Sequence, residues 1–156
     1  MKKKSDEKLK IIPLGGLEQI GMNITAFECQ DSIVLVDCGL AFPEDDMLGV
    51  DLVIPDVTYL LENADKVKGL CITHGHEDHI GAIPYILKQI NMPIYATKLT
   101  NGLIENKLKE HGMLRTVKRK VVKYGQSIKQ GSFRIEFIKP NPSNQDAAAL
   151  ALFSPA

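Results

Sequence analysis

The chain has 156 residues, enough for one domain with a single core, and 44% hydrophobic and 24% charged residues are ordinary for a soluble globular protein. Lysine plus arginine balances aspartate plus glutamate at 19 each, so bulk charge does not indicate a polyanionic partner, although a local basic patch can bind one. No run approaches the roughly 18 apolar residues of a membrane-spanning helix, which argues against a membrane partner. The opening MKKKSDEKLK is basic without an apolar segment behind it, so it predicts a tail at 1–10 rather than a secretion signal.

The first third of the chain predicts three strands followed by a long loop. The third strand is rich in β-branched residues and ends at the polar Asp37. Glycines between the first two strands are typical of a hairpin turn. The loop at 39–56 carries five acidic residues, and loops of this length are often functional. The strands are expected at 9–15, 23–29 and 32–38.

Helices and strands alternate in the rest of the chain. A short helix is expected after Asp56, which is a plausible N-cap. A buried strand at 67–73 leads into a helix that begins close to Asp78, because Pro84 is tolerated only in a first turn. This order predicts an α/β layered domain. The remaining elements are a strand at 93–97, a helix whose apolar face runs from Leu99 to Leu108, and strands at 119–125, 132–139 and 147–153.

The chain has three cysteines, an odd number, and each lies in an apolar stretch. Their positions favour reduced core residues over a disulfide or a CxxC-type metal site, and this usage is typical of a cytoplasmic protein. The residues are Cys29, Cys38 and Cys71.

The segment CITHGHEDHIGAIP packs three histidines and an aspartate into the six positions 74–79. Sites in open α/β sheets lie at the carboxyl ends of strands, and the strand before this cluster is expected to end there. Side chains two apart in an extended loop point the same way, so His74 and His76 can bind one ion. Asp78 and His79, at the start of the following helix, turn toward a second position. Zinc accepts such imidazole and carboxylate ligands, and manganese is a possible alternative where oxygen ligands dominate.

The motif THGHEDHIG matches the signature of the metallo-β-lactamase superfamily. The segments LGGLEQIGMN, VDCGLAFPEDDMLGVDLVIPD and IYATKLTNGLIENKLKEHG make the chain more closely similar to ribonuclease J, in the β-CASP branch. The resemblance runs from about residue 11 to the end, which implies a partial metallo-β-lactamase domain at 11–156.

The resemblance implies an αβ/βα sandwich, of which this chain supplies roughly the first half. It also implies two zinc ions that share a hydroxide, which attacks RNA phosphodiester bonds in 5′–3′ exonuclease and endonuclease reactions of cytoplasmic rRNA processing and mRNA decay. His74 and His76 would bind one zinc, while Asp78 and His79 would bind the other. Asp37 would lie beneath the site as a carboxylate that orients the ligands.

Two departures from the family bear on activity. Where the family has a histidine in a stretch similar to NHSIPD, this chain reads NPSNQD, and Pro142 offers no lone pair to a metal. The chain also stops at Ala156, before the family's bridging aspartate, last metal histidine and β-CASP domain. A catalytic zinc normally has three protein ligands, so we expect weak metal binding and little or no hydrolysis by this chain alone. We also expect an apolar sheet face left exposed by a missing second sheet.

Two other functions remain open. The chain could be a non-catalytic remnant or subunit that pairs with an intact ribonuclease J or with a second copy of itself. It could instead be a small hydrolase of thioesters, since such enzymes also carry the HxHxDH motif. The basic stretch at 115–123 could contact RNA phosphates, or its charges could prevent an edge strand from pairing with another chain.

Overall fold

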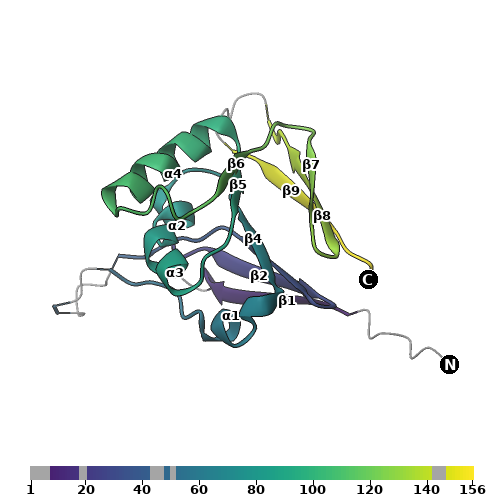
Figure 1. The fold of residues 1–156 in the computed structure, drawn as a ribbon, viewed down its shortest axis with the longest axis horizontal. Helices are drawn as coiled ribbons and strands as arrows, with labels where there is room; N and C mark the ends of the chain where they lie inside the picture. The colour runs from purple at the N-terminus through teal and green to yellow at the C-terminus, as the bar shows by residue number, and fades with distance from the viewer. Residues whose placement is uncertain (1–7, 18–20, 43–47, 50–51, 142–146) are drawn as a thin grey trace.

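A six-stranded mixed sheet forms the middle layer of the structure, a computed structural model that describes residues 8–17, 21–42, 48–49, 52–141 and 147–156. Helices cover one face of this sheet and a three-stranded sheet covers the other (Figure 1). The first three strands pair antiparallel, and the third to the sixth pair in parallel. In spatial order the strands are β1 (Leu9–Gly15), β2 (Ile24–Cys29), β3 (Ser32–Val36), β4 (Val67–Cys71), β5 (Ile94–Ala96) and β6 (Arg119–Val121).

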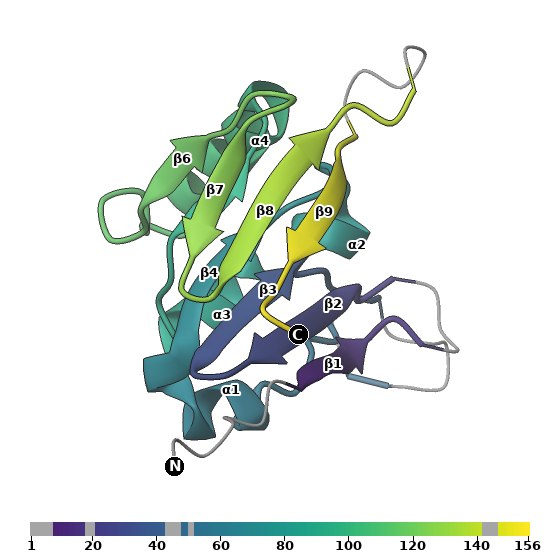
Figure 2. The ribbon, with the colours of Figure 1, turned by 90° about the vertical axis from the view of Figure 1, so that its right-hand side faces the viewer.

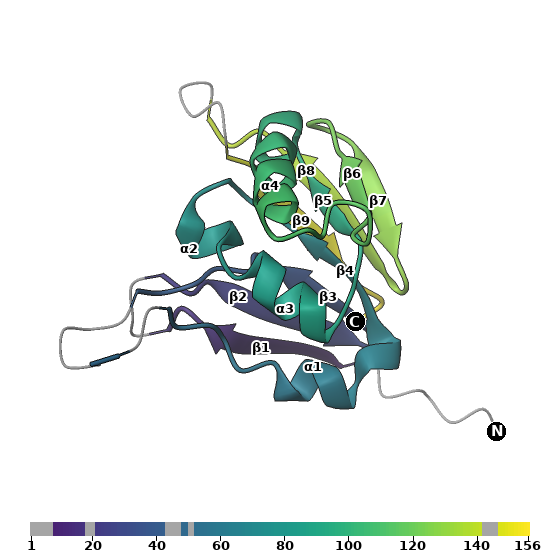
Figure 3. The ribbon, with the colours of Figure 1, turned by 60° about the vertical axis from the view of Figure 1, so that its left-hand side comes forward.

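The helical layer packs against the sheet through one apolar cluster (Figure 3). Leu35 and Leu70 of the sheet belong to this cluster together with Ile83 and Ile104 of the helices, and all four are fully buried. Among the described residues, no helix has the length and apolar character needed to cross a membrane. The helices are α1 (Thr58–Glu62), the 3-10 turn η1 (Ala64–Lys66), α2 (Glu77–Ile80), α3 (Ile83–Gln89) and α4 (Lys98–Glu110).

The second sheet consists of β7 (Ser127–Gln130), β8 (Phe133–Ile138) and β9 (Ala149–Phe153) and lies across the other face of the first sheet (Figure 2). Alternate residues of β8 are buried, as expected for a strand with one face on a core. Phe133 and Phe137 pack there with Val34 and Cys71 of the first sheet in a second apolar cluster.

The expectation that a missing second sheet leaves an apolar face exposed is wrong for most of that face, because the second sheet covers it. The exception is β1, which lies beyond the edge of the three-stranded sheet in Figure 2. Leu9 pairs with Cys29 and Ile11 with Phe27, so both side chains point to the sheet face that the second sheet covers elsewhere. Leu9 is 42% exposed and Ile11 is 60% exposed.

Three other expectations need correction. The strand β7 was not predicted, because its only large apolar side chain is Ile128. The single helix expected after Asp78 is two helices, since the Ala82 N–H donates to the carbonyl of Cys38 (3.0 Å) rather than to its own helix. The N-cap of α1 is Val57, although Asp56 still accepts a hydrogen bond from the N–H of Thr58 (2.9 Å).

The packing of the two sheets yields a stability prediction. Phe137 is fully buried between them, so Phe137→Ala should lower the free energy of unfolding by about 3–5 kcal/mol in urea denaturation. The adjacent Ile138 faces the other way and is 40% exposed, so Ile138→Ala is the matched control and should cost less than about 2 kcal/mol. Equal losses for the two variants would contradict the observed packing.

Candidate metal centre

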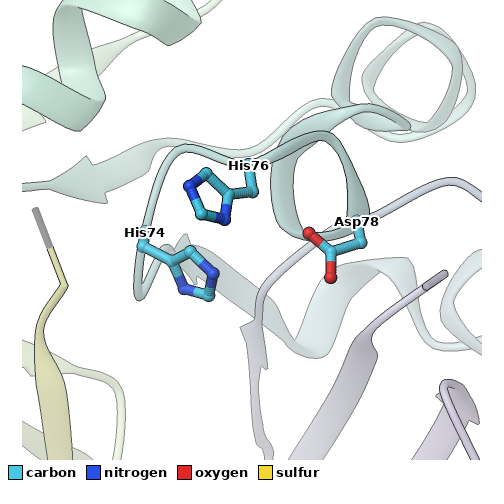
Figure 4. A group of neighbouring side chains, drawn as sticks. All are labelled: His74, His76 and Asp78. Carbon is cyan, nitrogen blue, oxygen red and sulfur yellow. The ribbon is translucent and has the colours of Figure 1, made fainter. Parts of the chain in front are cut away.

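The histidine cluster lies where β4 ends and α2 begins. His74 and His76 lie on the connecting loop, and His76 is the extended residue that precedes the helix. The carboxylate of Asp78, in the first turn of α2, points toward the two imidazoles (Figure 4). One potential ligand atom from each of these three residues lies within 4.8 Å of the others, so their donor set could hold one metal ion.

The fourth predicted residue, His79, joins the same group. Its ring centroid lies 3.7 Å from that of His74, and its Nε2 lies 3.5 Å from Oδ2 of Asp78. The structure therefore brings all four predicted residues together. Asp78 lies next to both the histidine pair and His79, so its carboxylate can serve either of two metal positions. The remaining histidine, His111, packs edge-on against Tyr85 instead.

Asp37 lies against the cluster, in contact with His79. It directly follows β3 with a φ of 63°, a left-handed conformation that aspartate tolerates better than most residues. Its carboxylate is buried and accepts hydrogen bonds from the Thr73 N–H (2.8 Å) and the Thr73 hydroxyl (2.7 Å). Nδ1 of His79 lies 2.8 Å from the same carboxylate.

These hydrogen bonds fix which imidazole nitrogens are available. Because a carboxylate only accepts, Nδ1 of His79 donates to Asp37, so its Nε2 carries no hydrogen and has a lone pair that can bind a metal. The Thr73 hydroxyl gives its hydrogen to Asp37, so it accepts one from Nδ1 of His74 (3.1 Å). Nε2 of His74 is then also free. Both imidazoles are thus held by Asp37, one directly and one through Thr73.

The same contacts separate the pKa values of the two histidines. Burial lowers the pKa of His79, but the hydrogen bond and negative charge of Asp37, with the charge of Asp78, outweigh burial and raise it above 6.5. Burial and the neighbouring His79 lower the pKa of His74, more than Asp37 raises it. His74 is therefore the readier of the two to be neutral, the state in which imidazole binds metals.

The three cysteines are buried and free, as predicted. Burial, followed by the charge of Asp37, raises the pKa of the Cys38 thiol far above its usual range and that of Cys71 to about 12. A thiol binds metal as the thiolate, so neither cysteine competes with the histidines for an ion.

Sequence reasoning missed two residues at the site. Thr73 was expected only as the end of a strand, and Asn23 only as the start of the strand at 23–29 and the end of the segment LGGLEQIGMN. Asn23 donates from its side chain to the carbonyl of Asp78 (3.0 Å). The position of Thr73 directly before His74 was an available signal in the sequence. The role of Asn23 becomes visible only in the fold. The prediction about Pro142 falls outside the described residues.

The donors fit a divalent metal of the zinc class. Two imidazoles with free Nε2 atoms, a third imidazole and a carboxylate are the ligand types that zinc accepts, and a carboxylate beneath the histidines is a common support for such ligands. Among the described residues, His74, His76 and Asp78 are the histidine, cysteine or acidic side chains that lie close enough together to hold one ion.

The pKa order is testable by NMR titration of the imidazoles in metal-free protein with a chelator present. We expect His79 to titrate above 6.5 and His74 below it. Because the pKa of folded His79 is raised, its protonation stabilises the fold fully at pH values below 6.5, and this contribution disappears as the pH rises through the raised pKa. Asp37→Asn should lower the pKa of His79. A His79 that titrates below His74 would contradict the assigned hydrogen bonds.

Sequence comparison connects this geometry with known proteins. The chain is 50% identical over 151 residues to ribonuclease J of Synechocystis sp. and 44% identical over 145 residues to ribonuclease J 1 of Streptococcus pyogenes. It is 40% identical over 150 residues to ribonuclease J 2 of Staphylococcus aureus. These matches cover 93–96% of the chain but only 24–27% of the relatives, so the chain spans about a quarter of their length.

Solved structures show the same fold at low sequence identity. A protein of unknown function from Enterococcus faecalis V583 superposes with a TM-score of 0.70 at 18% identity, over 95% of this chain and 41% of that one. Zn²⁺-bound PqqB from Methylobacterium extorquens gives a TM-score of 0.59 at 10% identity, over 85% and 49%. The family model for the metallo-beta-lactamase superfamily matches residues 23–147. The chain therefore belongs to the metallo-beta-lactamase superfamily, whose fold implies metal binding, and it is similar to the N-terminal portion of ribonuclease J.

Proposed function

We propose that this chain is the N-terminal, metal-binding part of a zinc-dependent ribonuclease that hydrolyses RNA phosphodiester bonds with two metal ions. The observation that carries the proposal is the cluster of His74, His76 and Asp78 in a chain 40–50% identical to ribonuclease J proteins over nearly all its length. In this proposal residues 11–156 form part of a metallo-β-lactamase domain behind a basic tail at 1–10.

Four residues would hold the ions. His74 and His76 would bind one, and Asp78 and His79 the other, with manganese as the alternative to zinc. When bound, a pair of such ions lowers the pKa of water and stabilises negative charge on the phosphoryl oxygens. Asp78 lies beside the histidine pair and beside His79, so its carboxylate is the group of this chain best placed to act in the reaction.

The supporting residues orient these donors. Asp37 holds Nδ1 of His79, and Thr73 holds Nδ1 of His74, so each ring presents Nε2 to the cluster. An imidazole that cannot rotate loses less freedom when it binds a metal, and a carboxylate partner makes its free nitrogen a stronger ligand. Asp37 is thus a positioning residue in the proposed reaction.

The 156-residue polypeptide is expected to be a weak catalyst by itself. Four donors divided between two ions give two each, whereas catalytic zinc normally has three protein ligands. The proposal also includes association with a second copy or with an intact ribonuclease J, since Leu9 and Ile11 leave an exposed apolar strip at β1.

Metal binding can be measured with a chromophoric zinc chelator as competitor. His76 is exposed, so His76→Ala should leave the fold intact and lower the affinity for zinc by about tenfold or more. His111→Ala is the matched control, because His111 packs against Tyr85 outside the cluster, and its zinc affinity should be that of the unaltered chain. An equal loss in both variants, or no zinc binding at all, would refute the proposed centre.

Hydrolysis can be measured on a 5′-monophosphorylated RNA with zinc or manganese present. We expect cleavage that is absent or far slower than the median of about 10 s⁻¹ for enzymes, and any cleavage that occurs should be lost in Asp78→Ala. Turnover at a typical enzymatic rate would contradict the proposed weakness of the isolated chain. Hydrolysis of a thioester without cleavage of RNA would replace the ribonuclease proposal with that of a small metallo-β-lactamase-fold hydrolase.

A further inference from the structure

Asn23 lies just before β2, far from the histidine motif in sequence, yet it contacts both Asp78 and His79. Its backbone N–H and its side-chain Nδ2 both donate to the carbonyl oxygen of Asp78, each at 3.0 Å. Two hydrogen bonds from one residue to one carbonyl fix the backbone of Asp78 relative to β2.

The short length of α2 makes these bonds necessary. A helix of four residues satisfies almost none of its own carbonyls, so other segments must do so. Cys38 donates to the carbonyl of His79 (2.7 Å), while that of Glu77 accepts from Gly81 at the helix end (2.8 Å) and also from Leu40 (3.3 Å). The carbonyl of Asp78 has Asn23 as its donor in place of a later turn of helix.

The same amide group also faces the donor atoms of the second metal position. Nδ2 of Asn23 lies 3.5 Å from Oδ2 of Asp78 and 3.4 Å from Nε2 of His79. An amide nitrogen has two hydrogens, and one is used on the Asp78 carbonyl. The other can be donated to Oδ2 of Asp78, which favours one orientation of the carboxylate.

Two glycines make room for this arrangement. A Cβ at Gly39 would lie 1.7 Å from the carbonyl oxygen of Asp78 and 2.9 Å from the backbone nitrogen of Asn23. Gly16 has a φ of 87°, and a Cβ there would lie 2.8 Å from Oδ1 of Asn23. Larger residues at either position would force Asn23 away from Asp78. The placement of this one amide thus accounts for Gly16 in the glycine-rich start and for Gly39 after β3.

We propose that Asn23 is a positioning residue for the metal position formed by Asp78 and His79. It sets the backbone of Asp78 through the carbonyl and the orientation of its carboxylate through Nδ2, and it makes no comparable contact with His76. This inference rests on the proposed function, because it requires that the cluster bind metal.

The test is a zinc titration of the 156-residue chain, followed through the imidazole NMR signals of each histidine. In Asn23→Ala, the response of His79 should need about 10–100-fold more zinc than in the unaltered chain. The responses of His74 and His76 should shift by a smaller factor, because Asp78 is the one residue through which Asn23 can affect them. Asn23→Leu removes the side-chain Nδ2 donor but keeps most of the side-chain volume, and it should give the same result as Asn23→Ala. Asn106→Ala, at an exposed position of α4, is the matched control.

The outcomes separate this inference from the proposed function. If the unaltered chain shows no response to zinc, both are overturned. If it responds and the His79 response is unchanged in the Asn23 variants, only the positioning role is overturned. An equal weakening of all three histidines, or loss of the folded metal-free chain in both variants by circular dichroism, would assign Asn23 to the fold and likewise overturn its positioning role.

Discussion

The metal centre depends on one buried carboxylate. Asp37 is 6% exposed, and a buried charge is tolerated only when hydrogen bonds or opposite charges compensate its lost hydration. Thr73 and His79 supply those hydrogen bonds. The groups that compensate the buried charge of Asp37 are therefore the same groups that its carboxylate holds in place, Thr73 and His79. The end of β3, the end of β4 and the start of α2 are joined at this point.

The sheet brings these groups together, and the backbone fixes them. Because β3 and β4 are parallel neighbours, Asp37 and Thr73 emerge at the same edge, and the Asp37 N–H continues the ladder to the carbonyl of Cys71 (2.9 Å). The loop after Asp37 then bonds to α2 in place of a longer helix. A helix this short is unstable by itself, so the ligand-bearing turn exists only because the surrounding loops complete its hydrogen bonds.

What the sequence could predict follows from the separation of the interacting residues. The donors at 74–79 are adjacent in the chain, so their spacing alone predicts a metal site. Asp37 was expected from a family resemblance, while Thr73, 36 positions away, was not singled out as its partner. Asn23 is 55 positions from Asp78, and no local pattern indicates that contact. The break between α2 and α3 was missed for the same reason, since the carbonyl of Cys38 takes the N–H of Ala82.

The donor cluster by itself does not select a substrate. Structures at 18% and 10% identity share this fold with TM-scores of 0.70 and 0.59, and a shared fold alone does not specify a function. The ribonuclease proposal depends instead on identity of 40–50% spread over nearly the whole chain, far beyond the six positions of the histidine motif. Asn23, Gly16 and Gly39 lie outside that motif and yet reach its backbone or support the residue that does. The hydrogen bonds of Asn23 to the carbonyl of Asp78 thus connect residues far outside the histidine motif to the backbone of the donor cluster.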